Sequence, residues 1–456
     1  MKPRNTLMTI GMSALLLSSC GLYQKYESKA EIPADVYGAN IKTDEASASV
    51  AEVSWREFFT DPLLQQLIDS ALISNTDLHS ARLATEQSQI ALQTSKLAYF
   101  PSLYFNPSGT LSSFNNSPVA KTYNLPLQLD LQLDVFGGLT NDKRKAEALL
   151  EQTRYQEEAM RTNVISNVAQ LYSRLQIYDR QLDILLSTEK LWATSLEVQK
   201  VLMENGKAYS TAVNQMEASY LNVKTQIIDL EKDIHSTELA LCRLLSISPR
   251  HISRSSWEAY QLPKNINAGI PSMQLSSRSD VKAAERAMEV AYYNVNAARS
   301  AFFPTISLSG SAGWTNNAGV ISDPGKLLWN AVASLTQPIF ARGKLRANLK
   351  ISKLSQEDIA RKYVQTVINA GNEVNEAIAN CLASQKKDTI YKRQVLVLKD
   401  AFDGTHELMN NGKASYLEVL TAQEALLQAQ LSEAMNLYDG CISTISLYIA
   451  LGGATK

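Results

Sequence analysis

Cysteine and histidine are among the side chains in this 456-residue sequence that could hold a metal ion or act as nucleophiles. Cys242, Cys381 and Cys441 are far apart, and each lies in a helical pattern with apolar neighbours. This pattern predicts small buried side chains rather than a disulfide framework or a metal site. The four histidines lack metal-ligand spacing, and the sequence has no P-loop, GxSxG or paired-cysteine motif. Nothing supports an enzyme, and we expect neither a cofactor nor a metal.

The remaining cysteine, Cys20, ends the segment MKPRNTLMTIGMSALLLSSC. Lys2 and Arg4 precede an apolar stretch, which predicts a secretory signal peptide over residues 1–19. The ending LSSC resembles the lipobox of bacterial lipoproteins, in which the Cys20 thiol becomes lipidated, for example with palmitate. An ordinary signal peptide with an incidental cysteine is the alternative. A stable anchor generally needs two membrane signals, so we expect a further membrane-embedded element.

The bulk composition excludes several classes of protein. The net charge of −1 gives no basic excess for nucleic acid. After residue 20 the sequence has no run of 18 or more apolar residues, which argues against a transmembrane helix.

An internal repeat of about 203–206 residues organises the chain. Residues 75–103 and 278–306 share a long Ala-rich pattern that ends at Phe-Pro, where Pro101 or Pro304 stops a helix. The stretches LMENGKAYS (202–210) and LMNNGKASY (408–416) also correspond. We assign 20–61 to a lipidated segment and linker, 62–265 to the first repeat and 266–456 to the second.

Strand-like alternation follows each Phe-Pro. In YNLPLQLDLQLDVF, seven apolar residues fall on one face, which predicts a strand long enough to span a membrane. We expect strands over about 103–114, 123–136, 305–315 and 328–340. A soluble pair of hairpins is the alternative. The wet face, which would line a lumen, carries Gln128, Asp130, Gln132 and Asp134. Four strands cannot close a barrel, so several copies would have to share one.

Long helices with heptad spacing complete each repeat. Residues 140–203 contain no Pro or Gly, and a helix of this length reaches on the order of 90 Å. The pattern predicts two antiparallel helical hairpins with tips at about 204–208 and 410–414. Asn-Gly suits these tips, because Gly accepts the left-handed conformation that ends a helix.

Together these features resemble the outer-membrane efflux proteins of the TolC and OprM type, and more closely their lipoprotein branch. The resemblance runs from Trp55 to Gly453. Its most specific motifs are ELMNNGKASYLEVLTAQEALLQAQ (407–430) and EVSWREFFTDPLLQQLIDSAL (52–72).

The resemblance implies a mainly α fold with a small transmembrane β part. Three copies would form a twelve-stranded β-barrel on a periplasmic α-helical barrel. This trimer would be a passive conduit, lipid-anchored in the outer membrane. Its expected partners are outer-membrane lipid, a periplasmic membrane-fusion adaptor and an inner-membrane pump of the resistance-nodulation-division type. The alternative is a periplasmic coiled-coil adaptor or scaffold lipoprotein without a membrane barrel.

Site residues follow from the same resemblance. Adaptor contacts are expected at the two tips, although solvated charge is an equal alternative for the lysines; these residues are Asn205, Gly206, Lys207, Asn411, Gly412 and Lys413. A periplasmic gate is expected at Leu417, Glu418 and Thr421. Three copies of Glu418 would form an anionic ring that favours cations, with an ordinary exposed carboxylate as the alternative. Thr421 stands where an acid is common in the family.

Overall fold

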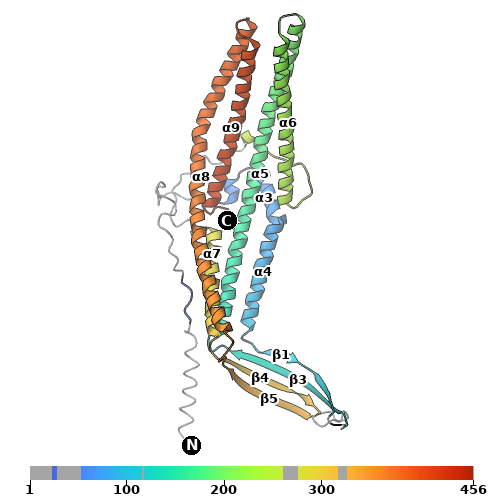
Figure 1. Cartoon of the computed structure of the whole chain (residues 1–456), viewed down its shortest axis with the longest axis vertical. Helices are drawn as coiled ribbons and strands as arrows, with labels where there is room; N and C mark the ends of the chain where they lie inside the picture. The colour runs from blue at the N-terminus through green and yellow to red at the C-terminus, as the bar shows by residue number, and fades with distance from the viewer. Residues whose placement is uncertain are drawn as a thin grey trace. The chain divides into compact units, whose positions relative to one another are not determined.

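The computed structural model describes residues 23–27, 53–113, 115, 118–259, 276–316 and 326–454 (Figure 1). The expected signal peptide, Cys20 and most of the expected linker lie outside these residues. The chain forms two compact units. The first is Met1–Glu31, Leu83–Tyr155 and Lys282–Gln365, and the second is Ile32–Arg82, Gln156–Val281 and Thr366–Lys456. Each unit therefore combines segments from both sequence repeats.

The first unit contains one antiparallel sheet. Its strands are β1 (Ser102–Phe105), β2 (Ser108–Ser112), β3 (Ala120–Leu133), β4 (Thr305–Thr315) and β5 (Lys326–Thr336). Strands β1 and β2 pair with different parts of β3, β3 pairs with β4, and β4 pairs with β5. Since β1 and β2 lie along the same strand, the sheet is effectively four strands wide. Its central pair, β3 and β4, joins the two repeats.

The segment for which one strand over 103–114 is expected forms two strands instead. Asn106 and Pro107 separate β1 from β2. Pro107 has no N–H for the strand ladder. The backbone N–H of Asn106 still donates to the carbonyl oxygen of Pro126, at 3.3 Å. The expected strand over 328–340 corresponds to β5, which ends at Thr336, before Pro338.

Asp134 is not a strand residue, contrary to expectation. Strand β3 ends at Leu133 rather than at residue 136. The Asp134 carboxylate accepts hydrogen bonds from the backbone N–H groups of Leu139 (3.0 Å) and Thr140 (2.8 Å) at the start of the next helix. These N–H groups have no partner within the helix, so an acidic cap stabilises its first turn. Asp134 therefore anchors a helix and does not continue the polar face of the strand.

The helices of the two repeats have equal lengths. Helices α5 (Gly138–Glu204) and α8 (Lys344–Asn410) each have 67 residues, and α6 (Ser210–Leu244) and α9 (Tyr416–Ala450) each have 35. Helices α4 (Thr76–Leu97) and α7 (Ser279–Ser300), each 22 residues long, precede the strands. The described short helices are α2 (Trp55–Phe58), α3 (Pro62–Ser74) and the 3₁₀ helix η3 (Trp257–Ala259).

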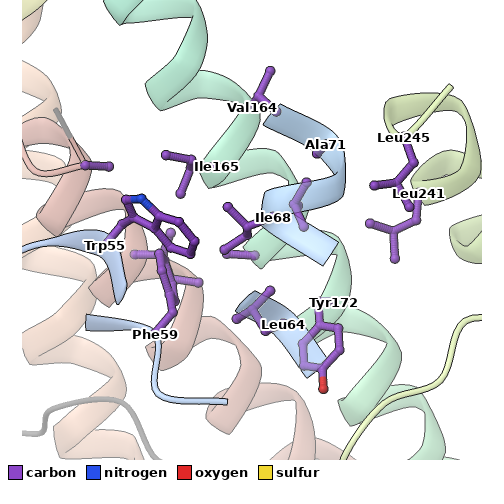
Figure 2. Close-up of a cluster of buried hydrophobic side chains, with 14 of the residues drawn as sticks. Trp55, Phe59, Leu64, Ile68, Ala71, Val164, Ile165, Tyr172, Leu241 and Leu245 are labelled. Atoms are coloured by element: carbon purple, nitrogen blue, oxygen red, sulfur yellow. The ribbon is translucent and has the colours of Figure 1, made fainter. Parts of the chain in front are cut away.

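A hydrophobic core holds the second unit together (Figure 2). Trp55 of α2, Phe59 of the turn after α2 and Ile68 of α3 lie in one cluster with Ile165 of α5. Phe58 stacks on Tyr448 of α9, with ring centroids 4.0 Å apart. Burial of each large side chain contributes roughly 1.5–3 kcal/mol. The segment before the first repeat is therefore a structural part of the helical unit.

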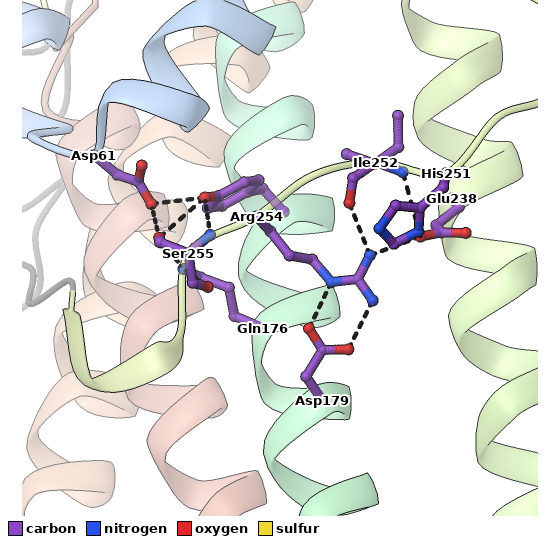
Figure 3. A network of polar contacts seen from close by, with 9 residues as sticks. Asp61, Gln176, Asp179, Glu238, His251, Ile252, Arg254 and Ser255 are labelled. Carbon is purple, nitrogen blue, oxygen red and sulfur yellow. Dashed lines mark hydrogen bonds and ion pairs between the residues drawn. The ribbon is translucent and has the colours of Figure 1, made fainter.

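A polar network beside this core fixes the chain after α6 (Figure 3). Asp61 caps α3 through the N–H of Leu63 at 2.9 Å, and it also accepts hydrogen bonds from the hydroxyls of Tyr172 (2.7 Å) and Ser255. Burial is the main reason that the pKa of Tyr172 rises to about 12, so its hydroxyl stays protonated and donates to Asp61. The Gln176 amide donates to the Ser255 carbonyl at 3.1 Å.

Arg254 forms the second half of this network (Figure 3). Its guanidinium makes two bonds to Asp179, at 2.6 and 2.7 Å, and one to Glu238, at 2.6 Å. His251 Nδ1 lies 2.8 Å from the same Glu238 carboxylate. The connection between the repeats is thereby tied to α5 and α6.

Candidate functional site in the sheet and at the hairpin tips

The sheet has one apolar face that runs across all of its strands. Directly paired residues share a face, so the register groups side chains from different strands. Leu129 pairs with Leu103 of β1 and Gly310 of β4, and Leu131 pairs with Leu308. The remaining apolar pairs across the centre of the sheet are Leu125 with Trp314, Leu127 with Ala312 and Leu133 with Ile306. The register therefore brings the apolar residues of β3 and β4 onto one face of the sheet.

The opposite face is polar in β3 and β4. Gln128, Asp130 and Gln132 pair with Ser311, Ser309 and Ser307 of β4, in that order. The Gln128 amide donates to the Asp130 carboxylate at 3.0 Å, which places these two expected lumen residues side by side. The hydroxyls of Ser307 and Ser334 lie 2.7 Å apart on the next strand pair. A sheet with these two faces can separate lipid from water.

Both edges of the sheet are open among the described residues. Strand β5 pairs there only with β4, and β1 and β2 pair only with β3. Trp329 is 73% exposed and Leu335 is 64% exposed on β5. Exposed apolar side chains are unfavourable in water, and unpaired backbone groups are unfavourable in lipid.

The centre of the sheet contains an unusually close approach. Pro126 of β3 lies opposite Gly313 of β4. A Cβ atom on Gly313 would overlap the carbonyl oxygen of Leu125 and lie 2.6 Å from Pro126 Cα. Proline is rare inside a sheet because it cannot donate to the ladder. Only glycine fits opposite it here, a requirement that the sequence pattern does not reveal.

The two hairpin tips share one hydrogen-bond geometry. Gly206 and Gly412 both have a φ of +69°, the left-handed conformation that favours glycine. The N–H of Lys207 donates to the Leu202 carbonyl and that of Lys413 to the Leu408 carbonyl, both at 2.8 Å. These bonds define a Schellman motif, which satisfies the last carbonyls of a helix.

The asparagines before the tip glycines also close the helices. Asn205 donates from its side chain to the carbonyl of Val201 at 2.7 Å, and Asn411 donates to that of Glu407 at 3.0 Å. Their amides therefore have a structural task. The Lys207 and Lys413 side chains are exposed beside them.

The helices after the two tips begin differently. Tyr209 precedes α6 and makes no side-chain cap. Ser415 precedes α9 and forms a capping box with Glu418: the Ser415 N–H donates to the Glu418 carboxylate at 2.7 Å, and the Glu418 N–H donates to the Ser415 hydroxyl at 3.4 Å. The acid that distinguishes the second tip in sequence therefore has a structural role, which the pattern Ser-x-x-Glu could have indicated.

The three expected gate residues lie together beside α8. Leu417, Glu418 and Thr421 line a hollow of about 460 Å³ with Leu398 and Ala401. Leu417 is 53% exposed, which is unusual for a leucine in an ordinary core. This surface of α9 lies open in the single chain.

Other contacts link the two hairpins near their tips, and the sequence did not predict them. The Ser219 hydroxyl of α6 donates to the Glu424 carboxylate of α9 at 2.7 Å. Tyr416 packs against Leu196 and Met216 of the first hairpin, and burial raises its pKa. Met216 is fully buried in this cluster, so its side chain contributes to hydrophobic packing.

No helix among the described residues is long and apolar enough to cross a membrane. The part of the chain that the structure describes also contains no group of three or more His, Cys, Asp or Glu residues that could bind a metal ion. Cys242 is buried, and Cys381 and Cys441 are half-buried, none of them in a disulfide.

Comparison with known families completes this description. The sequence matches the family described as outer membrane efflux protein over residues 67–246 and 270–453, which together cover most of the chain. Each matched segment contains one pair of long helices. The chain belongs to the outer membrane efflux protein family.

Relatives of this efflux protein match it along nearly its whole length. It is 28% identical over 449 residues to the cation efflux system protein CusC of Escherichia coli K12, covering 96% of this chain and 97% of CusC. It is 27% identical over 459 residues to the probable outer membrane lipoprotein SilC of Salmonella typhimurium, covering 98% of each. A crystal structure of CusC matches with a TM-score of 0.83 at 26% identity, covering 94% of this chain and 98% of that chain.

The family establishes the function and the location of the chain. This efflux protein is an outer-membrane channel component of a tripartite efflux system, which implies a periplasmic adaptor and an inner-membrane pump as partners. Members of the family are channels and not enzymes. The alternative of a periplasmic adaptor or scaffold without a membrane part finds no support.

Proposed function

We propose that three copies of this chain form one channel, in which a twelve-stranded β-barrel spans the outer membrane above a periplasmic barrel of helices. The observation that supports this proposal best is the sheet, which has an apolar face, a polar face and two edges without partners among the described residues. Its expected lumen side carries Gln128, Asp130 and Gln132.

Backbone hydrogen bonding requires the strands to close. Each unpaired backbone group in lipid costs several kcal/mol, so an open four-stranded sheet is not viable there. Single-chain barrels start at about eight strands. Three copies give twelve, and each copy would pair its β5 edge with the β1 and β2 edge of the next. Such head-to-tail contacts close a ring.

Two sequence assignments complete the proposal. Cys20 carries the lipid anchor, in keeping with the name of the SilC relative, an outer membrane lipoprotein. Residues 62–265 and 266–456 are the two repeats, in keeping with the matched ranges and the equal helix lengths. We further propose that the adaptor docks on the tips that carry Gly206 and Gly412, with Lys207 and Lys413 as the charged contacts.

Membrane fractionation and electrophoresis test the trimeric channel. We expect the protein in the outer-membrane fraction, as a species that migrates as a trimer in SDS unless it is heated. Purified trimer should conduct ions across a planar bilayer. Recovery in the soluble periplasm, or a monomer without heating, would contradict the proposal.

For the gate we propose that three copies of Glu418 form an anionic ring, with Leu417 and Thr421 beside it. We predict that Glu418→Gln makes the purified channel severalfold less selective for cations, because the ring loses its charge. Glutamine also fits the last position of a capping box, so the start of α9 is preserved. The reversal potential in a salt gradient measures this selectivity.

The matched control for the gate is Glu407→Gln, which removes an exposed carboxylate from the other helix at the same tip. It should leave the selectivity unchanged. Equal selectivity in the parent chain and in Glu418→Gln would reduce Glu418 to its capping role.

A further inference from the structure

Charge is rare on the sheet, and the strand register shows where it lies. Among the strand residues that the structure describes, the charged ones are Lys121 and Asp130 of β3 and Lys326 of β5. Successive residues of a strand point to opposite faces, so Asp130 shares the polar face of β3 with Gln128. Lys121 lies on the apolar face with Leu125.

The register also places Lys326 on the polar face. Lys326 pairs with Thr315 of β4, and Thr315 pairs with Asn124 of β3. Asn124 lies six residues before Asp130 on the same strand, so both point to the same side of the sheet. The polar face of the described strands therefore carries one acidic and one basic residue. Their levels are separated by about 20 Å along the strands.

The groups around the Asp130 carboxylate on this face are neutral. Its register partners are Ser102 of β1 and Ser309 of β4. The Gln128 amide donates to the carboxylate at 3.0 Å. Because the amide has no net charge, this hydrogen bond orients the carboxylate without cancelling its charge. Each Asp130 therefore adds one negative charge to the polar face.

We propose that Asp130 forms a second charge-selective ring of the channel, inside the β-barrel, and that Lys326 forms a ring of opposite sign at the far end of β4. This inference rests on the proposed trimer, which supplies three copies of each side chain at one level. The ligands are the permeant ions. The Asp130 ring raises the local concentration of small cations and lowers that of anions. The barrel thus adds to the selectivity of the proposed gate.

Barrel geometry sets the size of the effect. Twelve strands spaced about 4.8 Å apart and tilted by about 40° close at a backbone radius of about 12 Å, which leaves inward-pointing carboxylates about 10 Å from the axis. Three charges at this distance change the ratio of cations to anions on the axis roughly fivefold in about 0.1 M salt, where the screening length is about 10 Å. In about 1 M salt the screening length is about 3 Å, and the effect nearly vanishes.

Reversal potentials in a KCl gradient test the Asp130 ring. We compare Glu418→Gln with the double variant Glu418→Gln/Asp130→Asn, so that the proposed gate charge is absent from both. Asparagine keeps an oxygen that can accept the hydrogen bond of the Gln128 amide. We expect the ratio of K⁺ to Cl⁻ permeability to fall roughly fivefold in about 0.1 M salt and to stay nearly unchanged in about 1 M salt. Equal ratios of the two channels in the dilute salt would overturn the ring.

Two lysine variants test the register with Asp130 left in place. Lys326→Gln removes the positive ring and should raise the ratio of K⁺ to Cl⁻ permeability in about 0.1 M salt. Lys121→Gln is the matched control, because it makes the same change on the apolar face of the sheet. It should keep the parental ratio. Equal ratios for the two lysine variants would overturn the placement of these charges, and this comparison decides the question even if the Asp130 variant does not assemble.

The parent chain separates this inference from the proposed function. A parent chain that conducts no ions would contradict the channel itself, and the ring with it. A parent chain that conducts, with a double variant that assembles and keeps the reversal potential of Glu418→Gln, would overturn the ring and leave the channel standing.

Discussion

Gly313→Ala is expected to abolish the SDS-resistant trimer and its conductance. The added methyl group would overlap the carbonyl oxygen of Leu125 and press on Pro126, both backbone atoms of β3 that cannot rotate away. Overpacking costs about 1–3 kcal/mol even in water. In lipid, separating β3 from β4 also exposes backbone groups at several kcal/mol each. Unheated electrophoresis and planar-bilayer recording measure the loss.

Gly310→Ala is the matched control for this prediction. It adds the same methyl group three residues earlier on the same strand. There the new Cβ would lie 3.5 Å from the Asn330 carbonyl oxygen, an ordinary van der Waals contact. We expect trimer yield and conductance close to those of the parent chain. Equal behaviour of the two variants would show that the close approach of β3 and β4 is not needed for assembly.

Arg254→Met is expected to destabilise the helical unit by about 3 kcal/mol. The substitution leaves Glu238, which is only 7% exposed, without its main partner, and it also removes two hydrogen bonds from Asp179. Breaking a buried ion pair costs roughly 3–5 kcal/mol, and the lower end applies because Asp179 is 40% exposed. The unfolding temperature, followed by circular dichroism, should fall.

The pH dependence of this destabilisation tests whether it comes from the lost ion pair between Arg254 and Glu238. Burial acts to raise the pKa of Glu238, but the hydrogen bonds and charge of Arg254 outweigh it, so the pKa of Glu238 lies below its ordinary value of 4.5. The parent chain therefore keeps this stabilisation above about pH 4.5 and loses it as the pH falls through the lowered pKa.

In the variant the direction of the pKa shift of Glu238 reverses. Burial of Glu238 is no longer opposed by Arg254, so its folded-state pKa rises above the unfolded value and the charged form destabilises the fold. His251, which faces the same carboxylate, can offset this only in its protonated form. The difference in unfolding temperature between parent and variant should thus be larger at pH 8 than at pH 5.

Arg180→Met serves as the control, because Arg180 lies next to Asp179 on α5. Arg180 pairs with Glu258, which is 67% exposed, and lies 4.0 Å from Glu433. Exposed ion pairs contribute about 0–1 kcal/mol, so this variant should unfold close to the parent temperature. A drop as large as that of Arg254→Met would attribute the effect to the general loss of a positive charge beside α5.

Much of the architecture could be predicted from sequence, because periodicity reports local structure. The alternation over 123–133 corresponds to the two faces of β3, and the Asn-Gly pairs lie at the turns between long helices. The strand register between β3 and β4 could not be predicted, because it joins residues about 180 positions apart. Asp134 was assigned wrongly because the alternation continues past the strand while its carboxylate caps α5.

Several side-chain hydrogen bonds near the second tip were not predicted from the sequence. Glu418 stood out as an acid near a turn, and its bond to Ser415 needed only the Ser-x-x-Glu spacing to be noticed. The link from Ser219 to Glu424 had no local signal, because the two residues lie on different hairpins. The contacts of Arg254 with Asp179 and Glu238 likewise depend on segments that are distant in the sequence.

The mixing of the two repeats within each compact unit limits when the chain can fold. Strand β3 ends at Leu133 and must wait for β4, which begins at Thr305. Trp55 and Phe58 must wait for Tyr448, close to the other end of the chain. Long-range pairings of this kind form slowly, since the entropy of closing a long loop is lost before any contact is gained. A half-exported chain therefore presents an apolar β3 without its neighbour, and its passage across the periplasm calls for a holding chaperone until the last helix has arrived.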